Sequence, residues 1–206
     1  MSATATVVTL VDAANPEDEV LARAATVLRD GGLVAFPTET FYGLGASAND
    51  PAAVRRVFDV KGRAESKPLL VLVDSIAMAE SLAAEVTPRA RALMVGHWPG
   101  ALTLVLRARA GLPRELTSGT GTIGVRLSPH PIARRLVSAL AGPLTAPSAN
   151  LEGAAPPTTA ADVLRVFDGA IDLVLDGGAT AGGPASTVVD VTAASPRVLR
   201  HGAVSI

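Results

Sequence analysis

The 206-residue sequence contains no cysteine, which excludes disulfides, thiolate metal sites and a cysteine nucleophile. Aromatic residues make up only 3% of the chain, and this scarcity argues against a surface on which single-stranded nucleic acid stacks. The formal net charge is −1, so the chain lacks the overall basic field of a dedicated nucleic-acid binder. Any site for an anion must therefore be a local cluster of basic residues.

Long apolar runs are also missing from the sequence. Hydrophobic residues account for 49% of the chain, but glycine, proline and charged residues divide them into runs too short to span a bilayer. Residues 1–6 lack the basic region and apolar core of a signal peptide. We expect a soluble, cytoplasmic protein with no membrane segment.

Apolar strand patterns alternate with helical patterns early in the chain, and strands dominate late. We therefore expect an α/β fold with a mixed rather than purely parallel sheet, in a single domain that covers residues 1–206. The first helix is expected to have Asn15 as its cap, Pro16 as its first residue and Gly31 as its stop. The predicted helices cover residues 16–29, 51–61, 76–84, 88–95, 130–141 and 159–167. The predicted strands cover residues 33–36, 69–73, 102–107, 122–127, 144–146, 171–175, 187–191 and 198–200.

Residues 59–69 are the most informative stretch, because Lys61, Arg63 and Lys67 precede an apolar strand within seven residues. The pattern places all three cations in the loop that connects a helix to this strand. Ammonium and guanidinium groups supply charge-assisted hydrogen bonds to phosphate oxygens, so the loop suits a polyanion. The alternative is a solvated loop that keeps the edge of a strand soluble.

Other turn segments are rich in hydroxyl, amide and charged groups. Residues 37–45 leave the first predicted strand and are more polar than a plain connector needs, although threonine and glycine also serve capping and turns. Arg126 stands near the end of an apolar strand, either for function or as the strand's exit to solvent. Ser148 and Asn150 follow another strand and lie on the same side if the segment is extended.

Taken together, these segments resemble the YrdC-like family of threonylcarbamoyl-adenylate synthases in its short, single-domain form. The resemblance covers residues 31–202. The motifs that carry it are F-P-T-E-T-F-Y-G-L-G at 36–45, K-x-R with K-P-L at 61–69, W-P-G-A-L-T at 98–103, V-R with H-P at 125–131, A-P-S-A-N followed by glycine at 146–153, S-T-V-V-D at 186–190 and L-R-H-G at 199–202.

The resemblance implies a YrdC-like single domain with a twisted mixed sheet, flanking helices and a concave basic face. It also implies a role for each matching residue, with Lys61 and Arg63 as the catalytic cations. The residues expected to bind ATP are Lys61, Arg63, Lys67, Thr122, Ser148, Asn150, Ser186 and Arg200. The residues expected to bind L-threonine are Thr40, Arg126 and Ala146.

The activity implied is the synthesis of threonylcarbamoyl-AMP and diphosphate from ATP, L-threonine and bicarbonate, for N6-threonylcarbamoyladenosine modification of tRNA. The reaction needs fixed cations and Mg²⁺ rather than a protein nucleophile, and Mg²⁺ is expected on the ATP phosphates with no metal ligand from the protein. The product is expected to pass to a tRNA threonylcarbamoyl-transferase complex. Binding of tRNA or double-stranded RNA is a further expectation.

Two departures from the family pattern bear on the amino-acid side. Leu72 stands where the family commonly has histidine, and it is expected to remove a polar contact from the threonine site. Ala185 replaces a frequent glutamate. These departures leave open a paralogue with weak or no synthase activity that binds nucleotide or double-stranded RNA. A structural RNA-binding module is a third reading, which the net charge and few aromatics disfavour.

Overall fold

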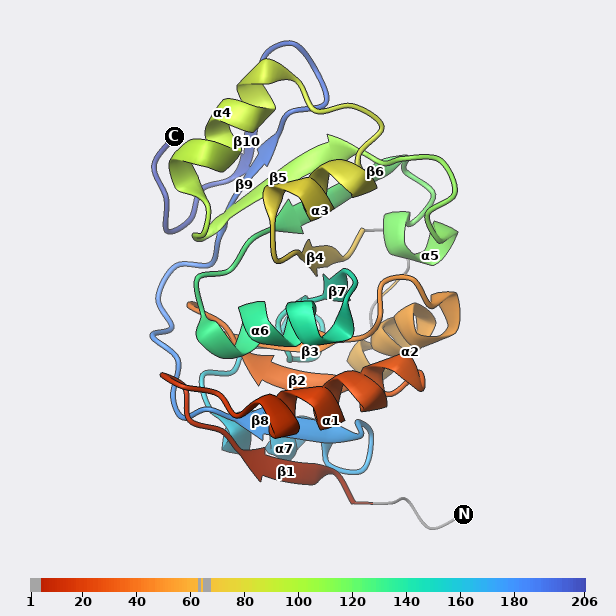
Figure 1. The fold of residues 1–206 in the computed structure, drawn as a ribbon, viewed down its shortest axis with the longest axis vertical. Coiled ribbons are helices and arrows are strands. Elements are labelled where there is room, and N and C mark those ends of the chain that lie inside the picture. Colours follow the sequence, from red (N-terminus) through yellow and green to blue (C-terminus); the bar gives the residue numbers. More distant parts are fainter. Residues whose placement is uncertain (1–4, 63, 65–67) are drawn as a thin grey trace.

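The computed structural model describes residues 5–62, 64 and 68–206. The strands in this part of the chain form two mixed sheets, and helices flank both of them (Figure 1). This arrangement confirms the expected mixed α/β class, although the strands divide between two sheets where one sheet was expected. No helix in the described ranges is long and apolar enough to cross a membrane.

The first sheet has the strand order β1-β8-β2-β3 and occupies the lower half of Figure 1. Strand β8 pairs in parallel with both β1 and β2, whereas β3 runs antiparallel to β2. The strands are β1 (Val7–Leu10), β2 (Val34–Pro37), β3 (Tyr42–Gly45) and β8 (Leu173–Asp176).

The second sheet has the strand order β10-β9-β5-β6-β4-β7. The pairs β9–β5 and β6–β4 are parallel, and the remaining neighbours are antiparallel. The strands are β4 (Leu70–Leu72), β5 (Leu102–Arg107), β6 (Thr122–Arg126), β7 (Leu144–Thr145), β9 (Thr187–Asp190) and β10 (Arg197–Arg200).

Thr145 joins the two sheets, and β7 accordingly lies between β3 and β4 in Figure 1. Its buried hydroxyl accepts a hydrogen bond from Ala46 N at 2.8 Å and donates to Leu44 O at 3.1 Å. Its backbone N–H donates to Ala46 O at 3.0 Å. A strand of one sheet is thereby fixed beside a strand of the other, and antiparallel bridges at Gly43–Ser148 and Ser47–Leu144 extend the contact on either side.

Helices cover the sheets on both faces. Helices α1 and α6 pack together in front of the first sheet, and α7 lies behind it (Figure 1). Buried leucines such as Leu28 and Leu136 fill the layer beneath α1 and α6, and Phe167 anchors α7 in the larger core. The helices are α1 (Asp18–Arg29), α2 (Pro51–Lys61), α3 (Ile76–Leu82), α4 (Pro88–His97), α5 (Arg114–Thr117), α6 (Pro131–Leu140) and α7 (Ala160–Phe167).

Helix α2 begins and ends as its sequence dictates. The Asp50 carboxylate accepts from the backbone N–H groups of Ala52 and Ala53, and Pro51 takes the first helical position. Gly62 ends the helix in the left-handed conformation, with φ of 58°, which glycine adopts at little cost. Lys61 is therefore the last helical residue, which confirms the predicted bounds 51–61, and it is buried, so its placement in the connecting loop was wrong.

The start of α1 also differs from the prediction. The Asp12 carboxylate accepts from the N–H groups of Ala14 and Asn15, which makes a turn where a helix cap was expected. The helix begins at Asp18, with Glu17 as its N-cap. Strands β1 and β3 and the short helix α5 were not predicted.

Candidate functional site

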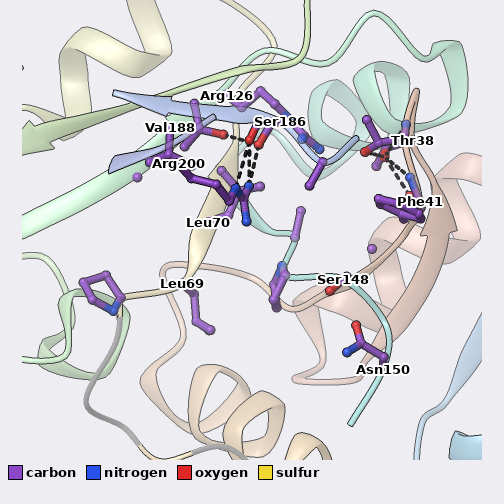
Figure 2. A pocket seen from close by; sticks show the side chains of 18 of the residues that line it. Thr38, Phe41, Leu69, Leu70, Arg126, Ser148, Asn150, Ser186, Val188 and Arg200 are labelled. Carbon is purple, nitrogen blue, oxygen red and sulfur yellow. Dashed lines mark hydrogen bonds between the residues drawn. The ribbon is translucent and has the colours of Figure 1, made fainter. Parts of the chain in front are cut away.

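A cavity of about 390 Å³ is lined by residues of both sheets and of the segments that leave them (Figure 2). Nine of the predicted site residues line it, and their individual roles stay predictions. Arg63 and Lys67 lie outside the described residues. The nine are Thr40, Lys61, Thr122, Arg126, Ala146, Ser148, Asn150, Ser186 and Arg200.

Lys61 reaches the cavity from the end of α2 and is only 2% exposed. Its ammonium donates to the backbone carbonyls of Ser148 and Asn150. A second link joins the same segments, because Glu152 N donates to Lys61 O at 3.1 Å. Lys61 thus fixes the turn at Ser148 against α2 and places a positive charge in the cavity wall.

The turn from Ser148 to Asn150 is also held from within. The side-chain amide of Asn150 donates to Leu151 O at 2.7 Å and to Ala154 O at 2.9 Å. The backbone of Ala149 donates to Tyr42 O at 2.8 Å, which ties the turn to β3. Asn150 therefore shapes the turn, and the carbonyl Oδ1 of its side chain is buried without a hydrogen-bond partner among the described residues.

Arg200 and Ser186 form a second polar group on the cavity wall (Figure 2). The Arg200 guanidinium donates twice to Ser186 O, at 2.9 and 3.0 Å, and once to Ser186 Oγ at 3.0 Å. Ser186 Oγ lies 2.9 Å from Thr103 Oγ1, and either hydroxyl can donate in this contact. Burial lowers the pKa of Arg200 from its ordinary value.

Gly202 lets the chain after β10 approach this group. An added side-chain carbon at Gly202 would lie 2.1 Å from Ala185 O and 2.6 Å from Ser186 C, which no packing adjustment of a side chain relieves. Ala203 N donates to Ala185 O at 2.9 Å across the same contact. Glycine at this position therefore allows the backbone contact that keeps Arg200 beside Ser186.

Arg126 lies at the end of β6 and is 3% exposed, so the expectation of an exit to solvent is wrong and the functional alternative remains. Its nearest anion is Glu39, with 3.5 Å between Nε and Oε1. Burial is the main cause that lowers the pKa of Arg126; the Arg200 charge lowers it further and the Glu39 charge opposes this. The two arginines thus face one cavity with mutual repulsion, which an anion between them relieves.

The segment from Thr38 to Phe41 forms the opposite wall. Thr38 Oγ1 donates to Phe41 O at 2.7 Å and lies 3.3 Å from Thr40 Oγ1. Gly182 N donates to Thr40 O at 2.9 Å, which holds this wall to the loop after β8. In Figure 2, Arg126 is drawn between Ser186 and this segment.

The residues that the structure places in or beside the site and to which the sequence assigned no role include Glu39, Thr103, Tyr42 and Ser128. Tyr42 lines the cavity and donates from its hydroxyl to Gly178 O at 2.7 Å. Burial, the Asp176 charge beside it and its hydrogen bond to Asp176 raise its pKa, although a backbone hydrogen bond opposes this. Glu39 and Thr103 stand inside motifs that carried the resemblance, so the motif positions were a usable signal. Ser128 had none.

The two departures from the family pattern have different positions. Leu72 is fully buried in the core cluster beneath α1 and α6, with Leu136 and Leu144, and it does not line the cavity. The expectation that Leu72 removes a contact from the site is therefore wrong. Ala185 does line the cavity.

Chemically, the cavity combines the cations Lys61, Arg126 and Arg200 with hydroxyl groups, and it suits a ligand with more than one anionic group. Apolar side chains, among them Leu69 and Val188, supply the rest of the wall. Among the described residues, no group of three or more histidine, aspartate or glutamate side chains is placed to hold a metal ion. A wider concave basic face stays a prediction.

Comparison with known families assigns the fold. The sequence profile of the Sua5/YciO/YrdC family, described as telomere recombination, matches residues 26–202. This match covers most of the chain, so the chain belongs to that family.

Individual relatives agree with this assignment. The threonylcarbamoyl-AMP synthase of Pyrococcus abyssi is 46% identical over 179 residues, which are 87% of this chain and 53% of the relative. The structure of P. abyssi Sua5 complexed with L-threonine matches with a TM-score of 0.92 and 43% identity, over 96% of this chain and 58% of that one. Escherichia coli YciO matches with a TM-score of 0.89 and 26% identity over 96% of both chains.

The chain spans about half the length of its P. abyssi and Bacillus subtilis relatives. The similarity therefore covers the part of those proteins that corresponds to both sheets and the cavity described above.

Proposed function

We propose that the chain is an L-threonylcarbamoyladenylate synthase, which forms threonylcarbamoyl-AMP and diphosphate from ATP, L-threonine and bicarbonate. The observation that carries the proposal is the meeting of Arg126, Arg200 and the Ser148–Asn150 turn in one cavity. The P. abyssi and B. subtilis relatives, at 46% and 40% identity, are named threonylcarbamoyl-AMP synthases. A matching structure, at 43% identity, has L-threonine bound.

The reaction requires two anionic substrates to lie side by side. The amine of threonine attacks bicarbonate and loses water, which gives a carbamate. A carbamate oxygen then attacks the α-phosphorus of ATP, the bond from this phosphorus to the bridging oxygen breaks, and diphosphate leaves. Positioning and compensation of negative charge supply the catalysis, and neither needs a nucleophile from the protein.

The amino-acid side is proposed at Arg126 and Thr40. A planar guanidinium binds a carboxylate through two parallel hydrogen bonds, so Arg126 suits the threonine carboxylate. The hydroxyl of Thr40 and the backbone of Ala146 line the same part of the wall and would contact the rest of the amino acid.

The nucleotide side is proposed at the Ser148–Asn150 turn and at the Arg200 group. Arg126 and Arg200 line the same cavity, so the two sides would adjoin, as a reaction between a carbamate and the α-phosphorus requires. The residues assigned to ATP are Lys61, Arg63, Lys67, Thr122, Ser148, Asn150, Ser186 and Arg200, with Lys61 and Arg63 as the catalytic cations.

Mg²⁺ is proposed to enter with ATP. Mg²⁺ is typically held by substrate phosphates and water together with one or two carboxylates at most. When bound, the ion would compensate the charge of the leaving diphosphate.

The proposed place of action is the cytoplasm, where the product would pass to a tRNA threonylcarbamoyl-transferase complex. The proposed binding of tRNA or double-stranded RNA would depend on surface lysines and arginines. Neither partner is needed for the synthesis itself.

The decisive experiment is diphosphate release from ATP by the purified chain, with L-threonine and bicarbonate each omitted in turn. Release that needs both substrates supports the synthase. Threonine-independent release, or nucleotide binding without release, favours the family paralogue that binds nucleotide or double-stranded RNA. L-Serine and L-valine serve as matched substrates that lack the methyl or the hydroxyl of threonine.

A further inference from the structure

Glu39 lies beside Arg126 and is not among the residues that line the cavity. Its Oε1 lies 3.5 Å from Arg126 Nε, and its Oε2 accepts a hydrogen bond from the hydroxyl of Ser128. Ser128 is 1% exposed, and its oxygen also accepts from His130 N at 3.2 Å. The Glu39 carboxylate is therefore held by the hydroxyl of Ser128, on the segment after β6, and lies beside Arg126, the last residue of β6.

Among the described residues, Arg126 has Glu39 as its ion-pair partner. Its Nε is buried and makes no hydrogen bond within the described part of the chain, and Oε1 of Glu39 is in the same condition. A buried guanidinium beside a second arginine is unstable without an anion, because burial and repulsion both oppose its charge. The Glu39 carboxylate, which is not among the residues that line the cavity, is the anion that compensates Arg126.

We propose that Glu39 is a positioning residue, which fixes the guanidinium of Arg126 for the substrate carboxylate, and that Ser128 fixes Glu39. The part of this proposal that concerns L-threonine rests on the proposed function. In this arrangement Nε of Arg126 faces Glu39, and the Nη1 and Nη2 groups of the guanidinium would bind the substrate carboxylate. Substrate specificity at this wall is then set by two residues that do not touch the substrate.

The first test separates the two substrates by steady-state kinetics of diphosphate release. In Glu39→Gln, the KM for L-threonine is expected to rise about tenfold to hundredfold, because the charge that compensates a buried guanidinium is lost. The KM for ATP is expected to change less than about twofold, because the Glu39 carboxylate contacts Arg126 and Ser128, neither of which is assigned to ATP. Ser128→Ala is expected to shift the same constant by a smaller factor. Asp18→Asn, which removes a surface carboxylate paired with Arg135, is the matched control.

A double-mutant cycle distinguishes positioning from direct contact with the substrate. If Glu39 acts through Arg126, Glu39→Gln has no further effect on threonine affinity in an Arg126→Ala background. An equal fold-loss in both backgrounds would show that Glu39 contacts threonine itself and would overturn the positioning role. Glu39→Asp retains the charge at a shorter reach, so partial recovery of affinity is expected.

Crystal structures of the wild-type chain and Glu39→Gln provide a readout that is independent of activity. The guanidinium of Arg126 is expected to leave its wild-type position in the variant. An unchanged guanidinium would overturn the proposal. If the wild-type chain binds no threonine, the proposed function fails, yet this comparison still decides the role of Glu39. If Glu39→Gln does not fold, the structure of Ser128→Ala is compared with the wild type instead. A displaced Arg126 guanidinium would then support the proposal, and an unchanged one would overturn it.

Discussion

The ammonium of Lys61 donates a hydrogen bond to the backbone carbonyl of Ser148, although 87 residues separate them in the sequence. Lys61 ends α2, whereas Ser148 follows β7. A second bond to Asn150 O makes the contact a clamp on the turn. A residue predicted to bind phosphate thus also builds the wall against which the nucleotide is proposed to lie.

Lys61→Ala is therefore expected to lower both activity and stability. The rate of diphosphate release should fall about tenfold to thousandfold, because a fixed cation beside the phosphates is lost. The free energy of unfolding should fall by about 1.5–3 kcal/mol, the range for hydrogen bonds to a charged group. Urea unfolding and the release assay measure the two effects.

Arg55→Ala is the matched control for this variant, since Arg55 lies on the same helix and its side chain is half exposed. Its ion pair with Glu115 is on the surface, where such pairs contribute about 0–1 kcal/mol. Wild-type release by Lys61→Ala would remove Lys61 from the catalytic group. An unchanged unfolding free energy would show that the clamp has no structural role.

Much of the fold follows from local patterns. Helix α2 was predicted because Asp50 and Pro51 form a strong N-terminal signal, and β5 was predicted with its observed bounds. Strand β1 was missed because Val7, Val8 and Leu10 are exposed and give no alternation. It pairs with β8, more than 160 residues away, so nothing local marks it.

The division into two sheets could not be predicted from local patterns either, because it depends on contacts between residues far apart in the sequence. Strand β3 has the sequence Y-G-L-G, and its two glycines are typical of a turn. Its pairing with the chain around Thr145 depends on contacts about a hundred residues apart. The cavity residues were assembled by family motifs and not by local pattern, and Ser128, which lies between the V-R and H-P pairs of its motif and belongs to neither, was missed.

Arg126→Ala and Arg200→Ala are expected to separate the two substrates. Arg126→Ala should weaken L-threonine binding about tenfold to hundredfold and leave ATP binding within about threefold, because its guanidinium is assigned to the carboxylate. Arg200→Ala should show the opposite preference. Calorimetry with each ligand alone measures both. Equal losses of both ligands in Arg126→Ala, at a normal melting temperature, would move Arg126 to the nucleotide side.

The Ser148–Asn150 turn gives a prediction that separates synthesis from RNA binding. Ser148→Ala removes a hydroxyl donor, and Asn150→Ala removes the amide that holds Leu151 and Ala154. Each change is expected to lower ATP-dependent turnover about tenfold to hundredfold. Retention on double-stranded RNA at low salt should stay near wild type, because neutral substitutions leave the phosphate contacts of lysine and arginine intact.

The opposite pattern would support the RNA-binding module. In that case RNA retention falls in Ser148→Ala and Asn150→Ala while turnover is preserved. Leu151→Ala is a suitable control, because its side chain is exposed beside the same turn and only its backbone accepts from Asn150. A loss in all three variants would indicate a general disturbance of the turn.

His130 predicts how stability depends on pH. Its Nδ1 is buried without a hydrogen-bond partner in the described part of the chain, and burial lowers its pKa while Glu39 opposes this shift. The unfolded chain, with a histidine pKa of about 6.5, therefore binds the proton more readily than the folded chain. Stability from neutral His130 is complete above about pH 6.5 and is lost as pH falls through the folded pKa. Urea unfolding should show a larger loss of the free energy of unfolding between pH 7 and 5 in wild type than in His130→Gln. His201→Gln, at an exposed histidine, is the control. Equal losses in wild type and His130→Gln would contradict this assignment.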